Sequence, residues 1–314
     1  MKIIFLGSPA FAVPSLEALY HSSHSIAAVV TQPDRATGRG LLPQAPPIKT
    51  SAHLMGIPVL QPVTTKAVEF VEEIKMFGPD LLVVVAYGEI LRPSLLRVAT
   101  RGAINLHASL LPHYRGAAPI PWAILRGETQ TGVTTMQMDE GMDSGPILLQ
   151  ATVPIHPADT ATVLSNRLAA LGADLLKETL HRLEQSDLAA RPQDSSQATF
   201  APKLKKQDGW IHWDKDAAYI ARQIRAFDPW PGSFSKLRQS SLKFWLAHPA
   251  QAQTDEQPGR IIKVSKEAFW VACGSGTVLQ VIEIQPENRP RLTVSDYLHG
   301  YRVAVGDVFQ SETV

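Results

Sequence analysis

The sequence contains a single cysteine, Cys273, among its 314 residues. One cysteine cannot form a disulfide within the chain, and small secreted domains that depend on disulfides carry several. A disulfide scaffold is therefore excluded. We expect the protein to work in a reducing compartment, which points to the cytoplasm.

Long apolar stretches are also missing from the sequence. The longest apolar run covers residues 81–86, whereas a helix that crosses a bilayer needs about 20 such residues. Residues 1–7, MKIIFLG, predict a β-strand and lack the cleavage site of a signal peptide. Both observations agree with a cytoplasmic protein.

Charge is sparse and nearly balanced. Asp, Glu, Lys and Arg make up 19% of the chain and the net charge is +1, while 45% of the residues are hydrophobic, which excludes a wholly disordered chain. Residues 1–202 hold 15 Lys and Arg against 17 Asp and Glu, and residues 203–314 hold 15 against 12. The excess of positive charge in the C-terminal part permits a polyanionic partner there but does not require one.

Motifs for nucleotide phosphates and for metals are absent as well. No P-loop pattern occurs, and Gly274-Ser275-Gly276 is not followed by a predicted helix, so that it predicts a hairpin turn. His107 and His113 lie on different predicted elements, and the sequence contains no cluster of cysteines. We therefore expect no metal site.

The length favours two domains, and the first half alternates short strands with helices. The predicted strands cover residues 3–6, 26–30, 81–86, 103–106, 132–138 and 147–153, and the last two are expected to pair as a hairpin. A long helix that begins at Asp159 or Thr160 closes this part. The order predicts an α/β fold, a doubly wound Rossmann-like domain over residues 1–188.

The composition changes after residue 188. Residues 189–206 are rich in Pro, Gln, Ser, Asp and Ala without periodicity, which predicts a linker. A helix over 217–226 and five short strands over 232–237, 242–246, 259–264, 269–272 and 278–284 then predict a smaller OB-like β-barrel over residues 207–314. The cluster of Lys203, Lys205 and Lys206 just before the barrel suggests contact with a nucleic acid.

The chemistry is concentrated near the strand predicted at 103–106. Asn105 and His107 alternate along the chain, so that both project from the same side near the carboxyl end of the strand, where open α/β sheets carry their active sites. Asp143 follows in a Gly-rich turn between two strands, where it can orient a histidine or accept a proton. Taken alone, each of these residues is equally compatible with an ordinary structural role.

The combination of motifs resembles a known family. Residues 105–112 (NLHASLLP), 115–117 (RGA) and 141–145 (GMDSG) closely resemble the signature of the 10-formyltetrahydrofolate-dependent formyltransferases. Residues 5–11, 31–35, 38–40 and 86–91 look like the branch of that family that acts on methionyl initiator tRNA, and residues 201–204, 209–213 and 224–231 are similar to the tRNA-binding domain of that branch. The resemblance covers nearly the whole chain and weakens beyond Pro286.

The resemblance implies a transferase that moves the formyl group of 10-formyltetrahydrofolate to the methionyl amine, for translation initiation. It implies donors at Asn105 and His107 for the negative charge that develops on the formyl oxygen, and Asp143 as the base or proton relay. The folate site would be lined by Ser109, Leu110, Leu111, Pro112, Tyr87, Gly88 and Ile90. No metal is implied, and we expect a monomer.

The partner implied by the resemblance is the tRNA. The loop predicted over residues 31–49 carries Arg35 and Arg39, which we expect to contact the tRNA together with the lysines before the barrel. The family commonly places lysines after the Gly-Arg-Gly turn, whereas this chain continues with Leu41 and Leu42.

Two alternatives remain open. A formyltransferase could act on a small amine, such as an aminosugar nucleotide or glycinamide ribonucleotide, but such a substrate needs no separate basic barrel. The chain could also be a nucleic-acid-binding protein whose α/β domain is catalytically dead, which the intact set of Asn105, His107 and Asp143 argues against.

Overall fold

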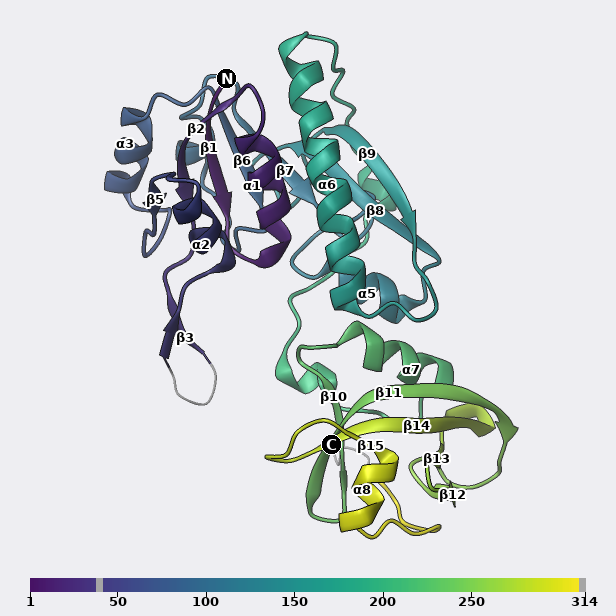
Figure 1. The fold of residues 1–314 in the computed structure, drawn as a ribbon. Helices are drawn as coiled ribbons and strands as arrows, with labels where there is room; N and C mark the ends of the chain where they lie inside the picture. Colours follow the sequence, from purple (N-terminus) through teal and green to yellow (C-terminus); the bar gives the residue numbers. More distant parts are fainter. Residues whose placement is uncertain (38–41, 311–314) are drawn as a thin grey trace. The chain divides into compact units, whose positions relative to one another are not determined.

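The structure is a computed structural model that describes residues 1–37 and 42–310 (Figure 1). It divides into two compact units. Unit 1 comprises Met1–Pro119, Gln130–Pro154 and Ser165–Pro202, and unit 2 comprises Ile120–Thr129, Ile155–Leu164 and Lys203–Val314. None of the helices in the described part of the chain combines the length and the apolar content needed to cross a bilayer.

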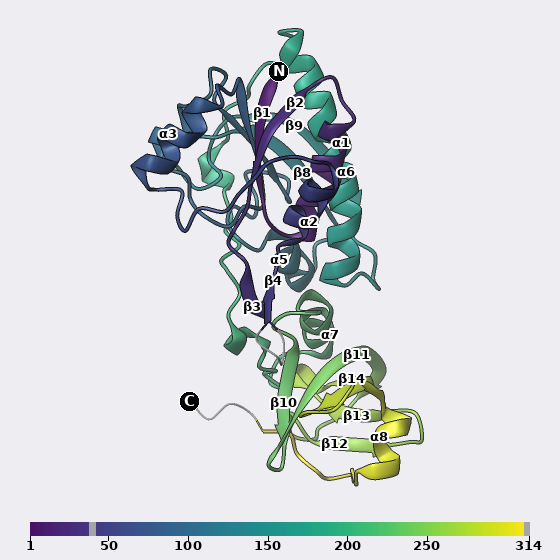
Figure 2. The ribbon, with the colours of Figure 1, turned by 60° about the vertical axis from the view of Figure 1, so that its left-hand side comes forward.

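Unit 1 is built on a seven-stranded sheet with the order β5-β2-β1-β6-β7-β8-β9 (Figure 1), which Figure 2 shows from another side. Its strands are β1 (Lys2–Gly7), β2 (Ser25–Val30), β5 (Val59–Leu60), β6 (Leu81–Val85), β7 (Ala103–His107), β8 (Gln130–Gln137) and β9 (Ile147–Pro154). The five strands from β5 to β7 run parallel, and β8 and β9 add an antiparallel hairpin. The doubly wound sheet and the hairpin are thus confirmed, and the uninterrupted burial of β6 and β7 explains their apolar sequences.

Helices connect these strands. The helices of the first part of the chain are α1 (Val13–Tyr20), α2 (Pro47–Leu54), α3 (Val68–Met76), α4 (Pro93–Leu96), α5 (Pro119–Arg126) and α6 (Ala161–Glu184). Of these, α5 from Ile120 onward and the first four residues of α6 belong to unit 2, and the rest belong to unit 1. The long helix α6 packs against β7, because a Cβ on Gly172 would lie 2.7 Å from Leu106. This close approach fixes the direction of the Leu106 side chain, and it places the neighbours Asn105 and His107 on the opposite face of the sheet.

The region expected to be a loop over residues 31–49 is partly regular, so that the expectation was wrong there. Strands β3 (Arg35–Thr37) and β4 (Leu42–Gln44) pair as an antiparallel hairpin, and α2 begins at Pro47 (Figure 1). Strands of three residues are too short to show an alternating pattern in the sequence. Residues 38–41, which include Arg39, lie outside the described residues.

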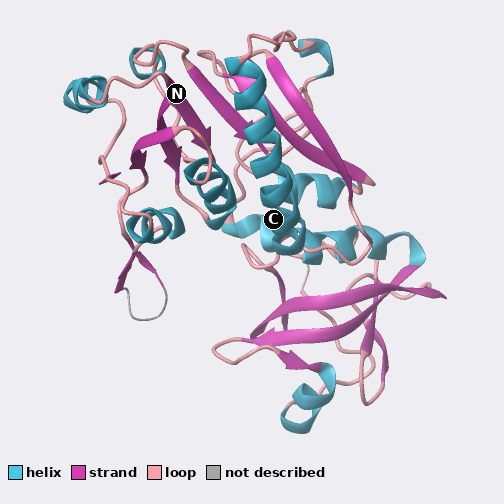
Figure 3. Cartoon of the chain, turned by 45° about the horizontal axis from the view of Figure 1, so that its top comes forward, coloured by secondary structure: helices cyan, strands magenta, loops and turns pink. Residues whose placement is uncertain are grey.

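Unit 2 contains an antiparallel sheet with the order β10-β11-β14-β13-β12, to which β15 is added beside β14 (Figure 1). Figure 3 shows the strands of the chain in magenta and the helices in cyan. Its strands are β10 (Ser233–Leu237), β11 (Ser240–Gln253), β12 (Ile261–Val264), β13 (Phe269–Ala272), β14 (Thr277–Pro286) and β15 (Leu292–Thr293), and its helices are α7 (Ala217–Ala226) and α8 (Val294–Gly300). Helix α7 begins at an Asp216 cap, which accepts a hydrogen bond from the Tyr219 amide. The five predicted strands and α7 are all present, which confirms the predicted fold class.

A short C-terminal segment joins the two edge strands of this sheet. The amide of Ile261 on β12 donates to the carbonyl of Asp307, and the amide of Gln310 donates to the carbonyl of Lys236 on β10, both at 2.8 Å. Phe309, between these contacts, is 1% exposed and stacks on Trp213 with a centroid distance of 5.1 Å. The segment thus closes the sheet into a barrel. The sequence predicted a barrel but did not reveal that this segment closes it.

Candidate active site

Strand β7 presents two polar side chains on one face of the sheet in unit 1. Asn105 is 8% exposed and His107 is 6% exposed, and both lie between the neighbouring strands β6 and β8. Burial of an amide and an imidazole costs free energy unless each finds polar partners. Their partners therefore define what this face can do.

Asp143 is the partner that both side chains share. It lies in the loop between β8 and β9, and its Oδ1 is 3.4 Å from Nδ2 of Asn105 while its Oδ2 is 3.6 Å from Nδ1 of His107. The structure thus brings together all three residues that the sequence singled out for catalysis. Their catalytic roles stay a prediction.

The orientation of the imidazole is set by a backbone carbonyl. Nε2 of His107 is 2.9 Å from the carbonyl oxygen of Tyr114, and because a carbonyl can only accept, Nε2 carries a hydrogen. The other nitrogen, Nδ1, therefore faces the carboxylate of Asp143. The two groups lie 3.6 Å apart and face each other, as the groups of an acid–base pair do.

Gly116 supplies a further donor to the same carboxylate. Its amide lies 2.8 Å from Oδ2 of Asp143, at a φ of +117° that favours glycine. A Cβ on Gly116 would lie 2.8 Å from the carbonyl oxygen of Ala201. A side chain at this position would therefore disturb the backbone that holds the carboxylate.

The segment predicted as a linker contributes directly to this region. The amide of Arg115 donates to the carbonyl of Thr199, and the amide of Ala201 donates to the carbonyl of Arg115, both at 2.8 Å. Gln193 of the same segment donates to the carbonyl of Asp143 at 2.9 Å. Sequence reasoning missed Gln193, Thr199 and Ala201. No local pattern indicates the backbone pairs of Thr199 and Ala201 with Arg115, more than 80 residues away, or the side-chain contacts of Gln193, which span 50 and 78 residues. The predicted boundaries of domains and linker remain a prediction.

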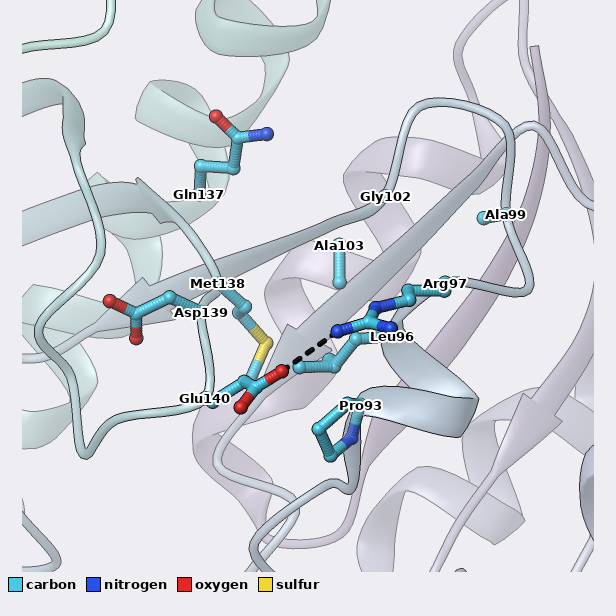
Figure 4. Close-up of a pocket in the computed structure, with 10 residues that line it drawn as sticks. All are labelled: Pro93, Leu96, Arg97, Ala99, Gly102, Ala103, Gln137, Met138, Asp139 and Glu140. Carbon is cyan, nitrogen blue, oxygen red and sulfur yellow. Dashed lines mark hydrogen bonds and ion pairs between the residues drawn. The ribbon is translucent and has the colours of Figure 1, made fainter.

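A cavity of about 440 Å³ lies beside the segment that leads to Asp143 (Figure 4). It is formed where β7 begins and β8 ends, between α4 and residues 137–140. Its lining combines apolar side chains such as Leu96 and Met138 with an ion pair at 2.9 Å between Arg97 and Glu140. The size is that of pockets for small organic ligands. Within the part of the chain that the structure describes, no three His, Cys, Asp or Glu side chains are grouped as metal ligands.

Formyltransferases resemble this chain over most of its length. A model described as "Formyl transferase" matches residues 1–180, and "Formyl transferase, C-terminal domain" matches residues 203–302. A relative named methionyl-tRNA formyltransferase from Geobacter sulfurreducens is 45% identical over 306 residues, which cover 98% of this chain and 96% of the relative. The chain belongs to the methionyl-tRNA formyltransferase family. A relative of the same name from Acetivibrio thermocellus is 45% identical over 309 residues, with 98% of this chain and 99% of the relative covered.

Solved structures show the same fold at lower identity. An N-formyltransferase from Helicobacter canadensis, in complex with folinic acid and dTDP-3-aminofucose, matches 90% of this chain and 98% of its own with a TM-score of 0.67 and 20% identity. HypX from Aquifex aeolicus, in complex with tetrahydrofolic acid, matches 99% of this chain and 51% of its own with a TM-score of 0.62 and 18% identity. At this identity the likeness shows the formyltransferase fold and nothing more.

The side chains predicted to line the folate site of this family member differ widely in exposure. Tyr87 and Leu111 are buried, and burial raises the pKa of Tyr87 to about 12. Ser109 is fully buried and its Oγ donates to the carbonyl of His113 at 2.6 Å. Leu110 and Pro112 are half-buried, and Gly88 and Ile90 are exposed. Only some of these side chains can therefore contact a ligand without rearrangement, and their role stays a prediction.

The residues predicted to bind tRNA lie in both units. Arg35 is exposed on β3 and donates to Oε1 of Gln32 at 3.1 Å. Lys203, Lys205 and Lys206 are exposed in unit 2. Arg39 lies outside the described residues, so that these assignments also stay predictions.

Proposed function

We propose that this protein transfers the formyl group of 10-formyltetrahydrofolate to the α-amino group of methionyl initiator tRNA, which prepares that tRNA for translation initiation. The observation that carries the proposal is the 45% identity, over nearly the whole length of both chains, with relatives named methionyl-tRNA formyltransferase. The buried group of Asn105, His107 and Asp143 supplies chemistry that suits this reaction.

The reaction begins when the neutral methionyl amine attacks the formyl carbon. A bond forms between the amine nitrogen and that carbon, and negative charge develops on the formyl oxygen. Asn105 directs one amide hydrogen toward Asp143 and keeps the second for the formyl oxygen. His107 donates from Nδ1 when it is protonated, because Nε2 is already engaged with the carbonyl of Tyr114.

The reaction ends when the bond between the formyl carbon and N10 of the folate breaks. The amine loses one proton and N10 gains one, so that the products are the formylated methionyl-tRNA and tetrahydrofolate. Asp143 accepts the amine proton and returns it to N10 as the folate leaves, while Nδ1 of protonated His107 keeps its hydrogen for the formyl oxygen. No oxidant, reductant or water enters the balance.

The folate co-substrate needs a site beside these residues. The cavity between α4 and residues 137–140 lies at the amino end of β7, where Gly102 and Ala103 line it, and none of the residues predicted to bind folate lines it. We place the folate instead at the carboxyl ends of the strands, along residues 109–112 and the exposed backbone around Gly88 and Ile90. We also propose that the enzyme works as a monomer in the cytoplasm, which sedimentation and cell fractionation can test.

The decisive assay offers 10-formyltetrahydrofolate together with one of three amines, namely methionyl initiator tRNA, an aminosugar nucleotide and glycinamide ribonucleotide. We expect formyl-methionyl-tRNA as the main product, with kcat/KM for the tRNA at least about a hundredfold above that for either small amine. Faster formylation of a small amine would contradict the proposed substrate. Absence of formyl transfer to all three, with retained tRNA binding, would favour the catalytically dead alternative.

A further inference from the structure

Gln193 joins the loop of Asp143 to a buried arginine. Its Nε2 donates to the carbonyl oxygens of Asp143 and Gly145, at 2.9 and 2.7 Å. Its Oε1 accepts from Nε and Nη2 of Arg115, at 3.1 and 2.8 Å. Because carbonyls only accept and a guanidinium only donates, this amide can take only one orientation.

Arg115 is itself held firmly in place. Its side chain is almost fully buried, with a residue exposure of 6%, and its backbone pairs with Thr199 and Ala201. A buried guanidinium needs hydrogen-bond acceptors to offset its lost hydration. Oε1 of Gln193 accepts two of the guanidinium's hydrogen bonds, so that a change at Gln193 also disturbs Arg115.

The backbone to which Gln193 donates its hydrogen bonds is strained at Asp143 and lies close to the reacting groups. Asp143 has a φ of +48°, in the left-handed region that costs free energy for a residue with a side chain. The carboxylate of Asp143 must stay between Nδ1 of His107 and Nδ2 of Asn105. The two hydrogen bonds from Gln193 supply the constraint that keeps the loop in this conformation.

We infer that Gln193 is a positioning residue for catalysis, and that Arg115 acts by holding the Gln193 amide in its productive orientation. This inference rests on the proposed formyl transfer. Among the hydrogen bonds of the described residues, none joins Gln193 to Asn105 or His107. Gln193 therefore affects the reaction by fixing the position of Asp143. Misplacement of a reacting group by about 1 Å can cost a hundredfold in rate.

The test uses Gln193→Glu and Gln193→Met in the full-length protein. Gln193→Glu retains the acceptor for Arg115 but offers no donor to the two carbonyls, and Gln193→Met keeps the length of the side chain without either function. Gln197→Glu is the matched control, because Gln197 is an exposed glutamine of the same segment and its Nε2 donates to Asp194, at 2.9 Å, rather than to the loop of Asp143. We expect kcat to fall by at least about tenfold in both Gln193 variants, and KM for folate and for tRNA to change by less than about threefold.

The pH dependence of kcat separates positioning from a loss of folded protein. Loss of folded protein leaves the shape of the profile unchanged once the folded fraction is measured at each pH, whereas a displaced carboxylate alters that shape. We expect the shape to change in Gln193→Met, which adds no titratable group, and to stay the same in Gln197→Glu. A Gln193→Met variant with wild-type kcat and profile would overturn the inference. An inactive wild-type protein would instead overturn the proposed function.

Discussion

The imidazole of His107 is oriented by a contact that no sequence motif contains. The carbonyl of Tyr114 fixes the hydrogen on Nε2, and the remaining nitrogen then lies 3.6 Å from Asp143. This distance is too long for a hydrogen bond of ordinary strength. Catalytic contacts are often long in the free enzyme and tighten when substrate binds.

Removal of any one of the three central side chains should mainly affect turnover. We expect Asn105→Ala, His107→Ala and Asp143→Ala each to lower kcat by about a hundredfold or more, as the loss of one oxyanion donor or acid–base group typically does. Steady-state titrations of both substrates check this expectation. The control is Asp174→Ala, since Asp174 is exposed on α6 and its carboxylate pairs with Lys177 at 2.9 Å. Near-wild-type turnover in the folded variants would remove these residues from the mechanism.

The lone cysteine should be inert in the native protein. Cys273 is 1% exposed, and burial raises the pKa of its thiol to about 12. The thiolate is the reactive form, so that at pH 8 only about one thiol in ten thousand is ionised. We expect no reaction with a chromogenic disulfide reagent at pH 8 in buffer, and one thiol per chain in urea. Fast labelling of the folded protein would contradict the buried position.

At the scale of elements, the barrel of unit 2 depends on a segment of the chain that looks unimportant in the sequence. Residues 306–310 hydrogen-bond to both edge strands, and Phe309 adds an aromatic ring to the core. Closure of this kind removes the unpaired edges that would otherwise invite aggregation.

Truncation of that ring should destabilise unit 2 strongly. We expect Phe309→Ala to lower the free energy of unfolding by about 3–5 kcal/mol, the usual cost of deleting a buried phenylalanine side chain. Urea unfolding followed by tryptophan fluorescence measures the change, because Trp213 stacks on this ring. Val305→Ala is the control on the same segment, since Val305 is 63% exposed. Equal stability of the two variants would show that the segment does not close the barrel.

At the scale of the whole molecule, the residue at which the chain is truncated should affect folate binding, although residues 189–202 have the composition of a linker. A chain that ends at Pro202 retains the backbone pairs of Thr199 and Ala201 and the contacts of Gln193, whereas a chain that ends at Leu188 loses them all. Each lost hydrogen bond is worth about 1 kcal/mol. The shorter chain should therefore bind folate at least about tenfold more weakly, and both should lose most of their tRNA affinity.

Fluorescence titration with folate compares the two chains directly. Both lack the same part of unit 2, so that the missing domain affects them equally and only residues 189–202 differ. Equal folate affinity and equal melting temperature would show that this segment is a linker in the ordinary sense.

The sequence by itself determined most of the fold and the chemistry of the site. The alternation of strands and helices, the long helix α6 and the five strands of the barrel all follow from local apolar patterns, which burial imposes on each element separately. Asn105, His107 and Asp143 could be singled out from the sequence. The alternation of side chains along a strand and the resemblance of short motifs can both be recognised within a few residues.

Only the tertiary structure decided which distant segments complete these elements. Three contacts depend on backbone pairing between segments that lie far apart in the sequence. Gln193 lies beside Asp143, Ala201 lies against Gly116, and Phe309 lies among the strands of the barrel. Such pairs use amides and carbonyls that every residue carries, so that they leave no mark in the composition or periodicity of the chain. For this physical reason no local pattern showed that a segment with the composition of a linker lies against the loop of Asp143.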